Sequence, residues 1–442
     1  MFTNGPVLLF SKSVLDRTGR WEDLAVWPFL AAAAVAGAAL AAWDLSGAGR
    51  RPVEASERIA AIAVAWFALA ALASSLWSVH PTATVWRSSI YIGMALLAWA
   101  IARLDAHDTS AAIGVVAAAA VGASLLLVVL RPDLGLGPSD YWRGVYTNRN
   151  SLAPLAAIGV LAGLRFALAP GRLPRGRAGG RENPVHTGEA VARAARERSE
   201  QERETPSPDA TGWHLPAHVL KRTAAVGLVL ASLAGLVGAG SRTAWVSLIA
   251  ALAVSSLPWV YHRAAGHRGR SQAGKMTAAA AGASAVAAAA GLVAVWNVPT
   301  LSQRRTIWSL VWDRIVQRPL GGHGFFTFWD IEELTQHVLL RRGSAHNSLV
   351  EVGLGLGLLG VVPFAAIVVL AARNAGLALW RRPGADTWMW AALVAFLLVE
   401  NVTESFVLWF SYSWVLLMAA ALRAPIVRGD AYTALDGAMM VE

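Results

Sequence analysis

Long runs of apolar residues alternate with shorter polar segments along most of the chain. A membrane-spanning helix needs roughly 20 apolar residues to cross a hydrocarbon core of about 30 Å. Eleven runs approach this length. They are residues 24–44, 59–79, 86–103, 111–130, 150–170, 222–240, 243–261, 276–297, 346–371, 387–401 and 404–422. The pattern predicts an all-α, polytopic transmembrane helix bundle of about 11–12 spans.

The amino-acid composition narrows the class of protein further. The chain of 442 residues is 56% hydrophobic and only 15% charged, which excludes an ordinary soluble enzyme. It contains no cysteine, so disulfides, thiolate metal sites and cysteine nucleophiles are excluded together. The net charge of +10 is interpreted as membrane topology and contact with anionic lipid, and we expect no nucleic-acid partner.

The polar segments divide the chain and orient it. The segment 171–221 is rich in Arg, Pro, Gly and Ser, and we expect it to be a disordered cytoplasmic loop. Alternation from there places the segment 298–345 outside, as a large, partly helical external loop. The resulting regions are N-terminal transmembrane helices (1–170), the cytoplasmic loop (171–221), further transmembrane helices (222–297), the external loop (298–345), C-terminal transmembrane helices (346–422) and a cytoplasmic tail (423–442).

Arginines gather in the segments expected outside, against the usual trend. They are Arg87, Arg131, Arg143, Arg149, Arg242, Arg304, Arg305, Arg314, Arg318, Arg341 and Arg342. Any single one could simply anchor a helix end at the membrane interface. Together they favour an anion site, because a guanidinium holds a phosphate through two hydrogen bonds and keeps its charge. With no cage of carboxylates beside them, we expect phosphate binding without a metal site.

The external loop has a helical pattern of its own. Apolar side chains fall at helical spacing from Ser302 to Gln317, and Trp308 is one of them. We expect an amphipathic helix, either lying in the membrane interface or packed as a lid on the spans. The Pro- and Gly-rich stretch from Arg318 to Phe326 ends this helix.

His346 stands where the ninth span begins. Ser344, two residues before it, is the expected N-cap of that span. An imidazole changes charge near neutral pH, so at the edge of an arginine-rich pocket it is suited to act as a general base. The alternative is an interfacial polar residue without chemistry, and His323 and His337 in the same loop are rival candidates for the base.

Polar side chains also open the fifth span and close the tenth. Asn148 and Asn150 are able to bind sugar hydroxyls or merely to cap a helix. Glu400 and Glu404 lie where the tenth span turns into the eleventh. An ionisable group at that depth marks a functional site or the partner of an arginine. Trp308 in the external loop is suited to stack on a sugar or a lipid.

Five motifs, in their order along the chain, resemble the O-antigen ligase and O-antigen polymerase superfamily of polytopic bacterial glycosyltransferases. They are Leu76-Trp77-Ser78-Val79-His80-Pro81 followed by Arg87, Gly144–Leu152 (GVYTNRNSL), Ser241-Arg242-Thr243-Ala244-Trp245, Arg305–Gly324, and His346-Asn347-Ser348 followed by Gly353, Gly357 and Gly360. The resemblance covers about residues 70 to 410, with the large external loop between the third and fifth motifs.

The resemblance implies a metal-independent, inverting glycosyltransferase of the cytoplasmic membrane with its active site on the external face. It would move a glycan from an undecaprenyl-diphosphate carrier to an acceptor hydroxyl, with no cofactor beyond that lipid-linked donor. By position, His346 matches the base, and Arg242 with Arg304 or Arg305 matches the arginines that hold the diphosphate. The substrate-binding residues expected are Arg304, Arg87, Asn148, Asn150, Asn347, Trp308 and Glu400.

Several alternatives stay open. Ligases, polysaccharide-unit polymerases and protein-glycosylating enzymes share these motifs and differ chiefly in the acceptor, which can be a lipid, a glycan or a protein. A transporter of lipid-linked glycans or anions is a competing interpretation, although such proteins usually show internal repeats and midplane charges. A membrane scaffold is a third. Expected partners are membrane lipids and other polysaccharide-assembly proteins.

Overall fold

The computed structural model describes residues 54–146, 149–168, 217–268, 271–272, 274–279, 299–330, 344–405 and 411–423. Over these ranges the chain is helical and forms no β-strand, apart from an isolated bridge between Leu136 and Trp142. Eight of the described helices are long and apolar enough to cross a membrane. The all-α, polytopic fold predicted from the hydrophobic pattern is confirmed, and the protein is a multi-pass membrane protein.

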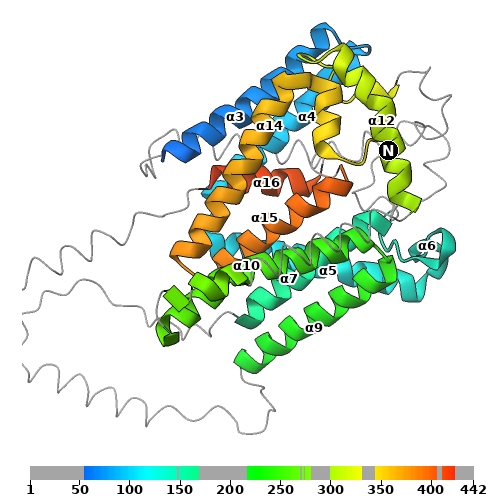
Figure 1. Ribbon diagram of the computed structural model, residues 1–442. Helices are drawn as coiled ribbons and strands as arrows, with labels where there is room; N and C mark the ends of the chain where they lie inside the picture. Colours follow the sequence, from blue (N-terminus) through cyan, green and yellow to red (C-terminus); the bar gives the residue numbers. More distant parts are fainter. Residues whose placement is uncertain are drawn as a thin grey trace, which may run out of the picture.

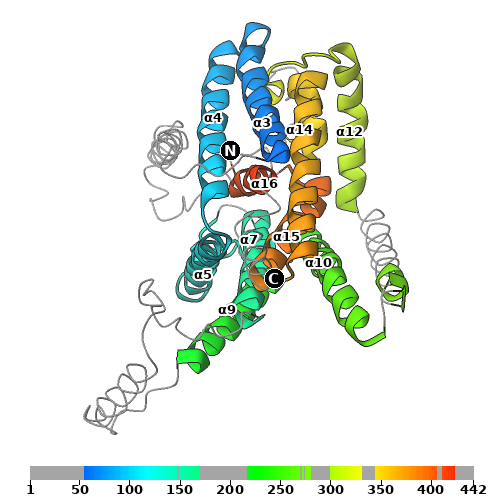
Figure 2. The same cartoon turned by 90° about the vertical axis from the view of Figure 1, so that its left-hand side faces the viewer.

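The eight spans form the body of the bundle in Figures 1 and 2. They are α3 (Ala55–Ala73), α4 (Pro81–Arg103), α5 (Ala106–Leu130), α7 (Arg149–Leu168), α9 (Ala217–Ala239), α10 (Arg242–Arg268), α14 (Ser348–Arg381) and α15 (Ala385–Thr403). Each overlaps one predicted span. The start of α9 lies inside the predicted loop 171–221, and the rest of that loop is outside the described residues, as are the predicted spans 24–44 and most of 276–297.

The predicted last span, 404–422, is wrong at its start. Helix α16 (Tyr412–Leu422) has 11 residues, and Glu404 ahead of it is not helical. At about 1.5 Å of rise per residue, α16 is too short to cross a hydrocarbon core of roughly 30 Å. It packs instead inside the bundle against α3, α4 and α14, with its apolar side chains buried.

Helix α7 lies at the centre of one half of the bundle and is the most deeply buried span. It packs against α5, α9 and α15. Small residues allow this, because a Cβ atom at Gly163 would press on Val229 and the Ala225 carbonyl of α9, and one at Gly159 would press on Ser232. Helix α10 lies along α15, and α14 packs on α3.

The bundle has two ends that carry different residues. Helix α14 ends at Arg381 and turns tightly into α15 at one of them, which we call the Arg382 end. The last turns of α10 lie there too, because a ring nitrogen of His262 lies 3.1 Å from the Trp380 carbonyl oxygen. Helix α10 therefore begins, and α15 finishes, at the opposite end, next to His346; we call this the His346 end.

The predicted amphipathic helix is confirmed as α12 (Pro299–Gln317), which lies along one side of the bundle in Figures 1 and 2. Its buried residues Ile307 and Val311 pack against Leu354 of α14 and Phe328. Trp312, another aromatic residue of α12, is 61% exposed. Of the two arrangements expected for this helix, the structure shows the one in which it packs on the spans.

The segment after α12 is fixed to α14 by backbone hydrogen bonds. Helix α14 is interrupted at Gly357, whose φ of 55° favours glycine. The freed backbone groups on both sides of this break pair with the segment, through His323 N–H to the Leu354 carbonyl and Leu358 N–H to the Pro319 carbonyl, each at 2.8 Å. The Pro- and Gly-rich stretch therefore sets the position of α12 relative to α14.

Candidate functional site

Three charged or titratable side chains form a chain of contacts at the His346 end. Arg304 Nη2 lies 2.5 Å from Glu404 Oε1, and His346 Nδ1 lies 3.2 Å from Glu404 Oε2. Glu404 is 8% exposed, Arg304 14% and His346 24%. The acid is thus enclosed by its two partners, while the histidine keeps an edge open to its surroundings. We call these three residues the His346 triad.

The triad joins three segments that are far apart in the sequence. Arg304 comes from the first turns of α12, His346 precedes α14, and Glu404 follows α15. The position of α12 is set by its packing on Leu354 and by the hydrogen bonds at the α14 break. The same contacts that hold α12 against the spans therefore bring Arg304 to Glu404.

His346 adopts an unusual backbone conformation. Its φ is 51°, in the left-handed region that residues other than glycine rarely occupy. Neighbouring groups hold it there, because its N–H donates to Ser344 Oγ at 3.0 Å, and Ser344 Oγ donates to Ser405 Oγ. Such conformations persist only where the surroundings impose them, and they gather at functional sites.

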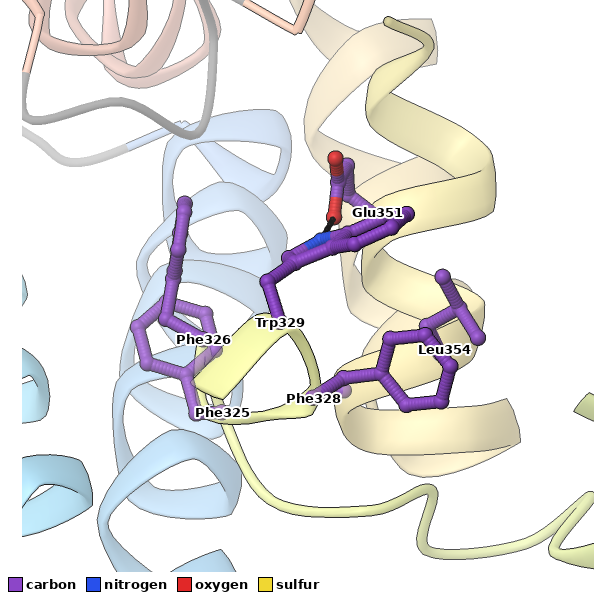
Figure 3. Close-up of a pocket in the computed structure, with 7 residues that line it drawn as sticks. Phe325, Phe326, Phe328, Trp329, Glu351 and Leu354 are labelled. Carbon is purple, nitrogen blue, oxygen red and sulfur yellow. Dashed lines mark hydrogen bonds between the residues drawn. The ribbon is translucent and has the colours of Figure 1, made fainter. Parts of the chain in front are cut away.

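The peptide before His346 is held from both sides. The N–H of Ala345 donates to Glu351 Oε1 at 2.5 Å, and its carbonyl accepts from Trp308 Nε1 at 2.7 Å. Glu351 is buried on the first turn of α14 and also accepts from Trp329 Nε1 at 2.8 Å, as Figure 3 shows. Trp308 therefore supports the histidine turn, and its predicted stacking on a sugar or lipid stays a prediction.

Asn347 rather than Ser344 caps helix α14. The side-chain oxygen of Asn347 accepts from the Val350 N–H at 3.1 Å, and its amide donates to the Val402 carbonyl at 2.9 Å. The expectation that Ser344 is the N-cap was wrong, because the Ser344 hydroxyl accepts from the N–H of His346, the residue just before the actual cap Asn347. Asn347 thus fastens the start of α14 to the end of α15, and its predicted substrate contact stays a prediction.

The electrostatics of the triad determine the protonation of its members. Burial alone would raise the pKa of Glu404, but the hydrogen bond from His346 and the charge of Arg304 outweigh burial and hold that pKa below its ordinary value. An ionised carboxylate only accepts hydrogen bonds, so His346 Nδ1 must carry the proton in this contact. We infer that a neutral His346 then has its lone pair on Nε2, which is the nitrogen that can accept a proton.

The two other arginines predicted to hold the diphosphate lie at the same end. Arg305 follows Arg304 on α12, and Arg242 is the first residue of α10; both side chains are exposed. Arg242 has no ion-pair partner within the described part of the chain. These exposed cations and the triad share one end of the bundle, and their catalytic roles stay predictions.

Two further predicted residues border the triad. Asn150 opens α7, and its amide nitrogen lies 3.5 Å from Glu404 Oε1. Glu400 is 2% exposed and precedes Glu404 by one helical turn. The structure brings both to the triad without testing whether either binds substrate. Asn148 and His337 lie outside the described residues.

Arg87 contacts the loop after α12. Its guanidinium donates to Asp330 and to the Phe326 carbonyl, both at 2.5 Å. Arg87 thus ties α4 to this loop, and none of its described contacts is to the triad. Its predicted role in substrate binding stays a prediction.

His323, a rival candidate for the base, is buried. Its Nε2 lies 2.9 Å from the Arg314 carbonyl oxygen, and 7% of the residue is exposed. Burial lowers the pKa of the His323 imidazole, the contact with the Arg314 carbonyl opposes this, and the charges of Arg318 and Arg314 add to the lowering. This histidine supports the loop, which leaves His346 as the better placed base of the two.

Two acidic residues of this site were not among the predicted site residues. Glu404 was noted beside Glu400 as an ionisable group, but its link to a histidine 58 residues earlier depends on tertiary structure. Glu351 looked like an ordinary first-turn acid of a helix. Among the described residues no group of three or more His, Asp and Glu side chains is placed to hold a metal ion.

Comparison with known protein families decides the relationship. The family model described as O-antigen ligase matches residues 227–365, about a third of the chain. The match supports the resemblance to the O-antigen ligase superfamily that the five motifs indicate. The matched region contains Arg242, Arg304 and His346, whereas Glu404 lies beyond it. No curated protein matches the chain. The match supports a glycan-transfer function in a membrane and an enzyme of the glycosyltransferase type.

Proposed function

We propose that this protein transfers a glycan from a lipid diphosphate carrier, undecaprenyl diphosphate, to an acceptor hydroxyl at the His346 end. The observation that carries the proposal is the His346 triad, in which a buried acid orients a partly open histidine at the end of the bundle that also carries the exposed Arg242 and Arg305. A base and a cluster of fixed cations are the two requirements for displacing a diphosphate by a hydroxyl.

The proposed reaction is a single displacement. The acceptor oxygen forms a bond to the anomeric carbon while His346 Nε2 takes the hydroxyl proton. The bond from that carbon to the diphosphate oxygen breaks, and the diphosphate leaves with the electron pair. One displacement at the anomeric carbon inverts its configuration. A diphosphate leaves readily, so the arginines need only stabilise its developing charge.

The arginines divide into two roles in this proposal. Arg304 is paired with Glu404, so it mainly keeps that acid ionised. Arg242 and Arg305 are exposed and are assigned to the diphosphate. A guanidinium presents two parallel N–H groups to a phosphate, which suits this role better than an ammonium group.

We place the His346 end on the external face of the cytoplasmic membrane. Helix α7 begins at the His346 end and ends at the Arg382 end, where Arg165 contacts Asp386, and the Arg-rich segment follows it in the sequence. The positive-inside rule assigns such a segment to the cytoplasm. Lipid-linked glycans would then be used on the side opposite to the one where soluble sugar nucleotides are available.

Polysaccharide analysis in a cell lacking this gene tests the proposal and separates its variants. Cells complemented with the wild-type gene are compared with cells carrying the empty vector. Full-length glycan stranded on its lipid carrier supports a ligase, whereas loss of long chains with single units still transferred supports a polymerase. Unchanged glycan on both carrier and acceptor would contradict glycan transfer, and lipid-linked glycan trapped on the cytoplasmic side would favour the transporter.

Transfer is expected to continue at full rate in the presence of a chelator. Arginines take the place of a divalent cation at the diphosphate in this proposal, so removing metal ions should leave the reaction unaffected. The measurement is transfer by purified protein in detergent with excess EDTA. Strong inhibition that added Mg²⁺ or Mn²⁺ reverses would contradict the assignment.

Arg242→Ala should lower transfer by roughly 10²-fold, because it removes one cation that stabilises the leaving group. Arg305→Lys should lower it by roughly 10-fold, since an ammonium cannot reproduce the two-point contact. Arg131→Ala is the matched control, because Arg131 is an exposed arginine at the same end whose partner is the nearby Asp133. Wild-type turnover of Arg305→Lys would make Arg305 a surface anchor only.

A further inference from the structure

A cavity of about 380 Å³ lies at the Arg382 end, on the opposite side of the bundle from the His346 triad. It is enclosed where α4 turns into α5, where α14 turns into α15, and where α16 ends. Helix α15 connects the two sites, with Trp390 lining the cavity and Glu404 following its last turn. Trp390 and Glu404 are 14 positions apart in the sequence, which corresponds to about 21 Å of helix. The cavity is therefore separate from the proposed site of glycan transfer.

Positive charge dominates the lining of this cavity. Three arginines, Arg103, Arg382 and Arg423, contribute to it, and Asp105 is the carboxylate among the lining residues. The Asp105 side chain accepts from the His107 N–H at 2.7 Å, where it caps α5. Three guanidinium groups against one carboxylate favour an anionic ligand.

Two of these arginines are held in place by contacts with the spans. Arg423 Nη2 donates to the Ile101 carbonyl at 3.0 Å and to Thr109 Oγ1 at 3.2 Å. The Arg423 guanidinium stacks 4.6 Å above the Trp390 ring. Arg103 stacks in the same way on Trp99, at 4.9 Å. Side chains held in this manner lose little conformational freedom when they bind a ligand.

A buried polar group also lines the cavity. The indole nitrogen of Trp390 is buried and makes no hydrogen bond within the described part of the chain. A buried N–H without a partner costs free energy, so it needs an acceptor. A nearby acid does not meet this need, because Asp386 is taken by Arg165 at 2.6 Å and by His107 at 3.4 Å. The cavity thus offers donors and few acceptors.

We propose that this cavity binds the phosphate-bearing head group of an anionic lipid. The pocket size suits a group larger than inorganic phosphate, and alanines from four helices supply an apolar wall beside the arginines. Its place at the ends of spans is where basic pockets between helices meet lipid head groups. A soluble phosphate compound has the same chemistry, so the experiment must separate the two sources. This inference does not depend on the proposed glycan transfer.

The test measures the thermal stability of the purified full chain in a neutral detergent. Three probes are added separately: phosphatidylglycerol, the zwitterionic phosphatidylcholine, and inorganic phosphate. We expect phosphatidylglycerol to raise the unfolding temperature at a concentration at least 10-fold lower than the concentration of phosphatidylcholine that has the same effect. In Arg103→Gln/Arg382→Gln the concentration of phosphatidylglycerol needed should rise at least 10-fold. Arg263→Gln, which removes an exposed arginine of α10 at the same end, should respond as the wild type does.

The outcomes are distinguishable. Equal responses of the wild type and the double variant, or equal responses to the two lipids, would overturn the proposal. Protection by inorganic phosphate alone, lost in the double variant, would support the anion site and overturn the lipid as its source. If the double variant does not fold, the single variant Arg382→Gln replaces it in the same measurement, because a substitution at the exposed Arg382 should not prevent folding. Glycan transfer is not measured, so failure here leaves the proposed function untouched.

Discussion

Glycan transfer by His346→Ala should fall at least about 100-fold, because the variant lacks the base that activates the acceptor hydroxyl. A hydroxyl attacks poorly unless its proton is removed as the new bond forms. His346 is 24% exposed and its Nδ1 is bound to Glu404, so Nε2 is the atom left to face an acceptor. The measurement is the initial rate of transfer to acceptor by purified protein, with the lipid-linked donor saturating.

The histidine at position 80 provides the matched control. His80 is exposed at the start of α4 and lies outside the triad, so His80→Ala should keep the wild-type rate. His346→Ala should also insert and elute as wild type does, since the strained backbone turn is held by Ser344 and Glu351 rather than by the imidazole. A His346→Ala protein that transfers normally would contradict the assignment of His346 as the base.

The spans could be predicted from the sequence because hydrophobic length is a local property. Eight predicted spans overlap observed helices. The error at 404–422 has a physical reason: Glu404 and Ser405 are polar, buried and bound to the His346 turn, and the backbone at Glu404 is extended rather than helical. A hydropathy pattern cannot show that two polar residues interrupt an apolar run for the sake of tertiary contacts.

The candidate site was predictable only in part. His346 and the arginines stand out because their residue types suit the chemistry and their motifs resemble a known family. Glu404 and Glu351 could not be assigned, since each acts through a partner that is distant in the sequence. The contact of Trp308 was missed for the same reason, because the sequence does not show that its indole reaches the Ala345 carbonyl.

Glu404→Gln should lower transfer by roughly 10²- to 10⁴-fold, even though Glu404 is a positioning residue that touches no substrate in the proposed reaction. An ionised Glu404 accepts the proton of His346 Nδ1 and so leaves the lone pair on Nε2. A glutamine can donate its amide N–H to Nδ1 instead, which would place the proton on Nε2, where it blocks the base. The substitution also leaves Arg304 without its counter-charge.

The role of Glu404 is tested by the kcat of Glu404→Gln, by the activity of the conservative variant Glu404→Asp, and by the pH dependence of stability. Asp133→Asn is the control, because it removes the carboxylate of another arginine pair at the same end, in which both side chains are 60% exposed. Glu404→Asp should recover part of the activity, since a carboxylate is again present. If Glu404 were merely structural, Glu404→Gln would lose stability with kcat preserved in the folded fraction, and that result would contradict the positioning role.

The pH dependence of stability gives an independent check on the same pair. The pKa of Glu404 is held below its ordinary value in the folded protein, so ionisation of this acid stabilises the fold. That stabilisation is fully present above the ordinary pKa of about 4.5 and is lost as the pH falls through the lower folded value. Wild type should therefore lose more stability than Glu404→Gln between pH 6 and pH 3. Glu404 is ionised near neutral pH and acts only by orienting His346. Protonation of Glu404 should therefore not limit transfer in that pH range.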